Sequence, residues 1–225
     1  SSADRKEVKK LAEDLTEDSE DTQALLKMAE KYEFAASQMR LSNKSKAQSF
    51  SEAANSLTMR SAIYGNAEAQ YKIASNLLTG NYCEKDVTKG VLWLTFAAQQ
   101  GHAPSQYLLA NHLLQGNGIQ AQSEKALTWY KTSAEAGYGP AKLAYIRLAL
   151  QQADANVDEL YALLPQPINE NDMKQLEIVA LVSAKKGDFI RAQAFQKKVL
   201  EIADELQFDK DSRMQQLQKY AANQF

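Results

Sequence analysis

Apolar residues recur every three or four positions in two similar stretches of the chain, a spacing that places them on one face of an α-helix. These stretches are GHAPSQYLLANHLLQGNG, which begins at Gly101, and GYGPAKLAYIRLALQQAD, which begins at Gly137. Each opens with a glycine and carries a proline three residues later. The pattern predicts one helix in each stretch, with the proline in the first turn, where backbone N–H groups have no helical partner anyway.

The two stretches are copies of one unit that recurs every 36 residues. A third copy, GNAEAQYKIASNLLTGNY, begins at Gly65, and the register continues into the next segment, where Trp93 corresponds to Trp129. Self-similarity at such a period marks an array of stacked units, each of which buries its apolar face against its neighbours. We therefore predict that the recurring tryptophans occupy equivalent core positions and do not line a ligand site.

Each unit is predicted to contain two helices joined by a loop. The first helix ends at Gly80 or Gly116, because glycine suits the left-handed conformation that commonly closes a helix. The second helix carries KGVLWLTFAAQQG or EKALTWYKTSAEAG. The composition agrees, since only four prolines and nine glycines interrupt a chain rich in helix-forming residues. The sequence therefore predicts an all-α protein.

The repeated unit resembles the Sel1-like repeat, a relative of the tetratricopeptide repeat about 36 residues long. The resemblance rests on AEAQYKIASNLLTG with KGVLWLTFAAQQG, and on APSQYLLANHLLQGNG with EKALTWYKTSAEAG. It is specific between Gly65 and Gln152. The resemblance implies a right-handed α-solenoid of stacked antiparallel helix pairs, about five in all, with a C-terminal capping helix.

Three regions follow from how far the resemblance extends. Residues 1–64 are interpreted as N-terminal helices that include a divergent first repeat, because ALLKMA at residues 24–29 parallels AQYKIA at residues 69–74. This first repeat is predicted to have a longer connection around RLSNKSKAQSF. Residues 65–164 are the Sel1-like array, and residues 165–225 are interpreted as a tetratricopeptide-like helix pair followed by the capping helix.

The boundary between the second and third regions follows from two prolines. Pro165 and Pro167 lie in LLPQPINEND, where proline removes backbone donors and disfavours helix in the residue before it. The later segment KKGDFIRAQAFQKKVLEI, from Lys185, is similar to the turn and second helix of a tetratricopeptide repeat. Val199 stands where a small residue is expected. The capping helix is predicted from an apolar stripe of Met214, Leu217 and Tyr220.

Charge and hydropathy limit the classes of binding partner and the cellular compartments that fit this sequence. The net charge of −2 and the pI near 5.8 give no basic surface for nucleic acid. No apolar run reaches the roughly 18 residues of a membrane span, so we predict no membrane insertion. The start SSADRKEVKK lacks the apolar core of a signal peptide. We prefer a periplasmic or secreted protein whose signal peptide has been removed, with the cytoplasm as the alternative.

Residues suited to catalysis or metal binding are few, and we predict no enzyme, no cofactor and no metal. His102 and His112 are ten residues apart, which on a helix separates them by about 80° and roughly 15 Å, so they cannot share a zinc ion. The acidic run EDLTEDSED at residues 13–21 lacks the glycine and final glutamate of an EF-hand loop, and is interpreted as a solvated connection and a helix N-terminus. Cys83, the single cysteine, is interpreted as a tolerated thiol.

The predicted partner is a protein or a peptide. Between residues 87 and 153 only seven of 67 residues are charged, and glutamine, asparagine and serine take their place. Such amide and hydroxyl groups favour hydrogen bonds to a peptide backbone or a neutral polymer. By resemblance to tetratricopeptide arrays, the partner-binding residues lie on a concave face lined by the first helix of each unit: Ser75, Thr79, Asn111, Gln115, Arg147 and Gln151.

These observations predict a non-catalytic protein–protein interaction scaffold that binds its partner on the concave face of the solenoid. The resemblance implies bacterial roles in assembling envelope, signalling or quality-control complexes. The alternative is a carbohydrate- or cell-wall-binding module of the bacterial envelope, in which Tyr71, Tyr107 and nearby amide groups contact sugar rings.

Overall fold

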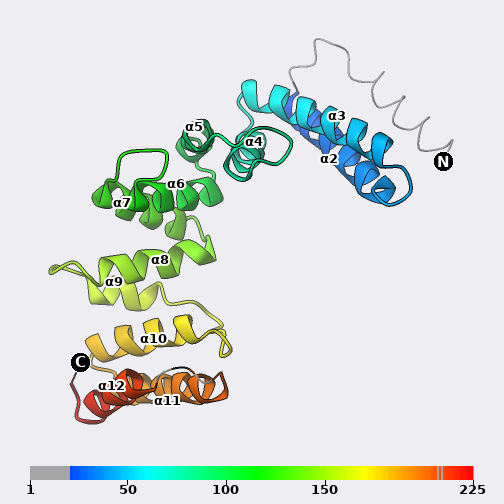
Figure 1. Ribbon diagram of the computed structural model, residues 1–225. Coiled ribbons are helices and arrows are strands. Elements are labelled where there is room, and N and C mark those ends of the chain that lie inside the picture. The colour runs from blue at the N-terminus through cyan, green and yellow to red at the C-terminus, as the bar shows by residue number, and fades with distance from the viewer. Residues whose placement is uncertain (1–20, 207, 209, 225) are drawn as a thin grey trace. The chain divides into compact units, whose positions relative to one another are not determined.

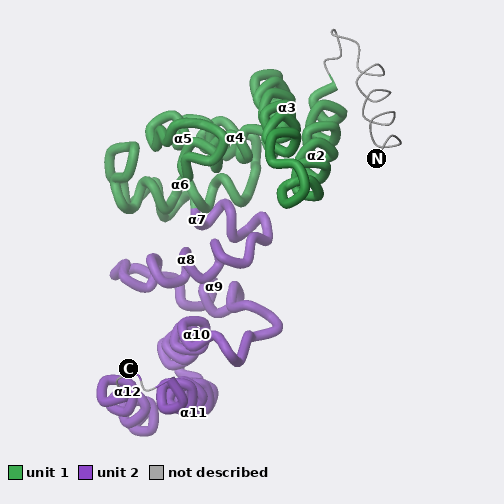
Figure 2. Tube along the Cα trace, turned by 45° about the vertical axis from the view of Figure 1, so that its right-hand side comes forward, with its two compact units in different colours: residues 1–129 green, residues 130–225 purple. Residues whose placement is uncertain are grey.

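The computed structural model describes residues 21–206, 208 and 210–224, and within them it contains eleven helices, α2 to α12, and no strand (Figure 1). The chain divides into two compact units, residues 1–129 and 130–225, and each is described by itself (Figure 2). The division falls inside helix α7. The three regions proposed from the sequence remain a prediction.

Unit 1 is a series of helices that pack against their neighbours in the chain. The pair α2–α3 is followed by the pair α4–α5, and α3 also packs against α4, as α5 does against α6 (Figure 1). This contact pattern is the one that an array of stacked helix pairs requires. The helices of this unit are α2 (Thr22–Met39), α3 (Lys44–Ile63), α4 (Ala67–Thr79), α5 (Val87–Gln99), α6 (Ala103–Gln115) and the first part of α7 (Ser123–Glu135).

The helix ends follow the sequence prediction. Gly80 and Gly116 adopt the left-handed conformation directly after α4 and α6, with φ of 82° and 69°. Pro104 and Pro140 lie in the first turn of α6 and α8. Of the acidic run at residues 13–21, all but Asp21 lies outside the described residues. The Asp21 carboxylate accepts hydrogen bonds from the backbone N–H groups of Gln23 and Ala24, so it caps α2.

The prediction of a longer connection in the first repeat is wrong. The segment between α2 and α3 is only Arg40–Asn43, and the additional residues lengthen the helices themselves to 18 and 20 residues, against 13 each in α4 and α5. Asn43 caps α3 by accepting a hydrogen bond from the Lys46 N–H, and the residues that follow contain neither proline nor glycine. Nothing therefore stops the helix from starting early.

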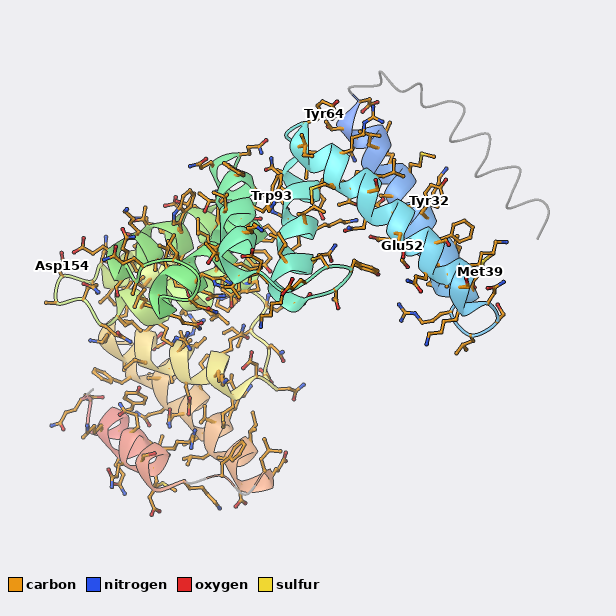
Figure 3. All side chains as sticks on the ribbon, turned by 45° about the horizontal axis from the view of Figure 1, so that its top comes forward. Tyr32, Met39, Glu52, Tyr64, Trp93 and Asp154 are labelled. Atoms are coloured by element: carbon orange, nitrogen blue, oxygen red, sulfur yellow. The ribbon has the colours of Figure 1, made fainter. Side chains whose placement is uncertain are left out.

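The tryptophans border the core and do not form its centre. Trp93 and Trp129 are both half-buried, and Trp93 packs on the cluster of Leu26, Ala62, Ala69 and Ile73 (Figure 3). Their environments are thus alike in exposure, as the repeat predicts. The most deeply buried positions that recur are the residue after the tryptophan position and the residues one helical turn before and after it. The residue after the tryptophan position is Thr58, Leu94 or Tyr130. One turn earlier it is Ala54, Gly90 or Ala126, and one turn later Ala62, Ala98 or Ala134.

Unit 2 continues the helical pattern past the two prolines. Pro165 and Pro167 lie in the loop between α9 and α10, as predicted, but α10 packs against both α8 and α9, so this loop lies inside one compact unit. The helices of this unit, besides the end of α7, are α8 (Gly139–Ala149), α9 (Val157–Ala162), α10 (Met173–Lys185), α11 (Phe189–Glu205) and α12 (Asp211–Ala221).

Within the predicted stripe of the last helix, Tyr220 is the most deeply buried residue and Leu217 is half-buried. Tyr220 is only 1% exposed and lies in a cluster with Ala180, Ala184 and Ala192, whereas Met214 is 44% exposed and does not share this core. Helix α12 packs on α11 (Figure 1). Val199 is fully buried in α11, so the larger side chain is accommodated there.

Candidate functional site

The structure divides the six predicted partner-binding residues between the two units. Ser75 and Thr79 belong to α4, and Asn111 and Gln115 belong to α6, all in unit 1. Arg147, on α8, and Gln151, just beyond it, belong to unit 2. A common binding face for all six residues is a prediction from the sequence.

Their surroundings differ from residue to residue. Ser75 and Asn111 are half-buried, and Thr79, Gln115, Arg147 and Gln151 are exposed. The Thr79 hydroxyl donates a hydrogen bond of 2.8 Å to the Ser75 carbonyl, so its hydrogen-bond donor is already engaged within α4.

The two histidines make separate structural contacts. His102 is the residue before α6, and its ring nitrogens lie 2.8 Å from the Ser105 hydroxyl and 3.0 Å from the Glu68 carboxylate. His112 Nδ1 lies 2.8 Å from the Asn117 carbonyl oxygen. In the part of the chain that the structure describes, no three histidine, cysteine, aspartate or glutamate side chains gather as a metal site would need.

The remaining residues singled out from the sequence have ordinary contacts. The Tyr71 ring packs against His102, with ring centres 5.0 Å apart, and Tyr107 is half-buried. These contacts give the sugar-binding alternative no support. Cys83 is exposed, with its sulfur 3.5 Å from the Asn81 carbonyl oxygen. None of the described helices is long and apolar enough to cross a lipid bilayer.

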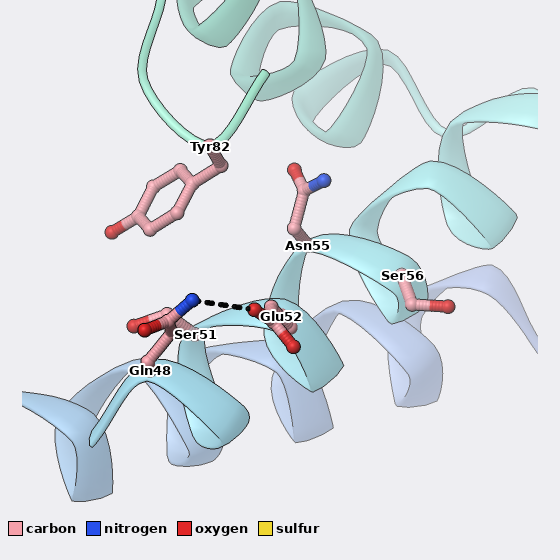
Figure 4. A pocket seen from close by; sticks show the side chains of 6 residues that line it. All are labelled: Gln48, Ser51, Glu52, Asn55, Ser56 and Tyr82. Carbon is pink, nitrogen blue, oxygen red and sulfur yellow. Dashed lines mark hydrogen bonds between the residues drawn. The ribbon is translucent and has the colours of Figure 1, made fainter. Parts of the chain in front are cut away.

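A hollow of about 440 Å³, lined mainly by residues with polar side chains, lies in unit 1 between α3 and the loop that joins α4 to α5 (Figure 4). Its floor is one face of α3, and Tyr82 from the loop stands across from that face (Figure 4). The sequence analysis did not identify this site. The hollow is lined by Gln48, Ser51, Glu52, Asn55, Ser56 and Tyr82.

Helix α3 presents these residues together because they recur every three or four positions. An adjacent side of the helix is buried through small residues such as Ala47 and Ala54. The Gln48 amide donates a hydrogen bond of 3.0 Å to the Glu52 carboxylate one turn further on. Asn55 accepts a hydrogen bond of 3.0 Å from the Asn76 amide, which ties this face of α3 to α4.

The loop that carries Tyr82 is fixed at both ends. The Asn81 N–H donates to the Asn76 carbonyl, and the Asp86 N–H donates to the Leu77 carbonyl. Asp86 also caps α5. The Lys89 backbone N–H donates to its carboxylate, and this hydrogen bond lowers the pKa of Asp86 below its ordinary value. Both ends of the loop are thereby held to the last turn of α4.

Tyr82 has a backbone conformation that side chains rarely adopt. Its φ is 63°, in the left-handed region, which costs a residue other than glycine about 1–3 kcal/mol. The side chain is 53% exposed, so burial in the core does not compensate for this conformation.

The equivalent loop of the next repeat packs more closely on the helix beside it. Its backbone hydrogen bonds are equivalent, from Asn117 to His112 and from Gln122 to Leu113, and Gly118 occupies the position of Tyr82 with φ of 73°. There the loop packs so closely on α5 that a Cβ atom on Gly118 would lie 2.7 Å from a Val87 methyl carbon.

The residue that corresponds to Val87 in the preceding repeat is Ser51. The close contact between Gly118 and Val87 is thus replaced by Tyr82 facing a serine across the hollow (Figure 4). A sequence signal existed, because Gln48, Glu52, Asn55 and Ser56 form a polar face on a helix. Tyr82, however, lies in a loop far from that face in the sequence.

Helices that pack in consecutive pairs with a recurring core place the chain in the class of α-helical repeat proteins. Residues 67–102 and 103–138 match the Sel1 repeat, so this part of the chain carries two Sel1 repeats. The resemblance predicted from the sequence is confirmed.

Solved structures support the same fold. The chain is similar to a Sel1 repeat protein from Oxalobacter formigenes, with 20% identity and a TM-score of 0.63 over 83% of this chain and 76% of that one. It is also similar to c5321, a protective antigen of uropathogenic Escherichia coli that displays an SLR fold, with 19% identity and a TM-score of 0.62 over 90% of this chain. The chain spans 45% of that antigen.

At these identities the likeness concerns the fold alone, and it confirms the predicted all-α solenoid class. No curated protein matches the chain.

Proposed function

We propose that the chain is a non-catalytic scaffold that binds a partner protein or peptide, and that the hollow on α3 is part of its binding surface. Sel1 repeats generally mediate protein–protein interaction. The observation that carries the proposal is the hollow itself, where an exposed aromatic ring faces a helix face of amide, hydroxyl and carboxylate groups.

The openness of the hollow favours a macromolecular segment over a small molecule. Pockets for small molecules enclose most of their ligand. This hollow is open, and five of its six lining residues carry amide, hydroxyl or carboxylate groups on α3 (Figure 4). Such groups exchange hydrogen bonds with a peptide backbone and polar side chains.

The concave-face residues extend the proposal beyond the hollow. Asn111 and Arg147 are the central residues of the predicted set, one in each unit. If a partner engages both units, replacing either residue by alanine weakens its binding while the helical circular dichroism spectrum stays unchanged. Unchanged affinity in both variants would remove the concave face from the proposal and leave the hollow.

The proposal is tested by site-specific photocrosslinking in the source organism. A photoreactive phenylalanine analogue replaces Ser56 at the hollow in one variant and the exposed Lys125 of α7 in a control variant. We expect a protein that crosslinks from residue 56 and not from residue 125, identified by mass spectrometry and then bound by the purified chain. The same crosslinks from both positions, or none, would contradict the proposal.

A further inference from the structure

The hollow on unit 1 brings together a carboxylate and an aromatic ring. Glu52 enters it from α3, the Tyr82 ring stands across from α3, and the other four lining residues are neutral amides and hydroxyls (Figure 4). We infer that this hollow binds an arginine side chain of the partner protein. The inference rests on the proposed function and specifies the chemistry that the partner presents at this surface.

Glu52 supplies the charge complementarity. In the described part of the chain its carboxylate accepts one side-chain hydrogen bond, from the Gln48 amide, and has no lysine or arginine partner. Three other carboxylates of unit 1 are paired: Glu30 with Lys72, Asp86 with Lys89, and Glu68 with His102. The negative charge at the hollow is therefore available to a cation from outside the chain.

Tyr82 supplies a face on which a guanidinium group stacks. A cation is attracted to the face of an aromatic ring, and arginine makes this contact more often than lysine because its planar group stacks. The equivalent position of the next repeat holds Gly118, the residue that suits this backbone conformation. Tyr82 keeps a backbone conformation that is unfavourable for it, and this conformation places its exposed ring at the mouth of the hollow, where a ligand would contact it.

The remaining lining groups match the other donors of a guanidinium group. Arginine has five N–H donors in a fixed plane and no acceptor. The second oxygen of Glu52, the hydroxyl groups of Ser51 and Ser56, and the side-chain carbonyl of Gln48 are acceptors on the same helix face. An anionic ligand is disfavoured, because no lining residue carries a positive charge and Glu52 would repel it.

The test uses the full chain and two small compounds of nearly the same shape. Both are blocked at the amino and carboxyl groups, so that only the side chain can carry a charge. N-acetyl-arginine methylamide carries the guanidinium group, and N-acetyl-citrulline methylamide replaces it by a neutral urea. Each is titrated into isotope-labelled protein, and amide chemical shifts are followed by NMR. We expect the arginine compound to shift the Gln48, Glu52 and Tyr82 amides in a saturable way, and the citrulline compound to leave them unchanged.

Variants assign this binding to the two groups. Glu52→Gln and Tyr82→Leu should each raise the Kd at least about fivefold, and Tyr82→Phe should retain binding because it keeps the ring. The control is Glu33→Gln on exposed α2 surface, which makes the same charge change outside the hollow and should leave the Kd unchanged. Unchanged amide spectra elsewhere show that each variant is folded.

The inference is overturned if citrulline shifts the same amides equally, or if Glu52→Gln and Glu33→Gln have the same effect. Its failure is distinguishable from failure of the proposed function. If the arginine compound does not bind but residue 56 still crosslinks a partner, the scaffold stands and the arginine site falls. If the compound binds as expected but no partner crosslinks, the site stands without the scaffold function.

Discussion

Two buried serines on different helices differ in whether their hydroxyl groups have partners. Ser61 and Ser183 are both 0% exposed. The Ser61 hydroxyl donates a hydrogen bond of 2.7 Å to the Thr22 carbonyl and links α3 to the start of α2. Among the described residues, the Ser183 hydroxyl has no hydrogen-bond partner. Burying a hydroxyl group is unfavourable unless a hydrogen bond replaces its contact with water.

We expect opposite effects when each serine is replaced by alanine. Ser61→Ala should lower the free energy of unfolding by about 1 kcal/mol, because a buried hydrogen bond is lost and the Thr22 carbonyl is left without it. Ser183→Ala should leave the free energy of unfolding unchanged or raise it by up to about 1 kcal/mol, because an unsatisfied group is removed. Urea unfolding of both variants measures this, and equal destabilisation would contradict it.

One carboxylate of helix α9 contacts both α7 and α8. Glu159 lies 2.8 Å from the Lys131 ammonium group of α7 and accepts a hydrogen bond of 3.0 Å from the Tyr145 hydroxyl of α8. The hydrogen bond from Lys131, and then that from Tyr145, lowers the pKa of Glu159 below its ordinary value of 4.5. Burial, followed by the hydrogen bond to Glu159, raises the pKa of Tyr145.

This carboxylate should make unit 2 less stable in acid. Because the pKa of Glu159 is lower in the folded protein, its contribution is complete above pH 4.5 and is lost as the pH falls through the lower folded value. Glu159→Gln should therefore lower the Tm at pH 7 by a few degrees, and this difference from the wild type should shrink below pH 4. Glu201→Gln, an exposed change on α11, is the control and should show no such pH dependence.

Helices were the most predictable level of structure. The positions of Gly80, Gly116, Pro104 and Pro140 indicated where the repeat helices begin and end, because these residues act through the local backbone. The length of α2 and α3 was not predictable from alignment to the repeats. An added segment without proline or glycine extends a helix or a loop depending on what it packs against, and here α2 and α3 pack against each other along their length.

Over the whole molecule, each unit is held by contacts of its own. Leu94 is fully buried in unit 1 and Leu176 is fully buried in unit 2. In stacked arrays the stability is close to a sum of the individual repeats and their nearest-neighbour contacts. A substitution in one core should therefore act mainly on the helices around it.

Hydrogen exchange measured by mass spectrometry tests this locality. Leu94→Ala should remove about 2–5 kcal/mol of stability around its site and speed amide exchange in α4, α5 and α6 more than in α10 and α11. Leu176→Ala should show the reverse pattern. Equal acceleration along the chain in both variants would instead mean that the two units unfold together.

The sequence by itself determined the all-α class, the Sel1-like repeat and the helix ends that glycine and proline mark, because periodic burial and backbone preference depend on residues close together in the chain. It also indicated which helix positions recur, although it placed the tryptophans in the core, where the structure leaves them half-buried at its border. Only the tertiary structure decided the site at α3. Ser51 and Tyr82 are 31 positions apart in the chain, and their meeting across a hollow depends on how α3 packs on α4, which no local pattern specifies.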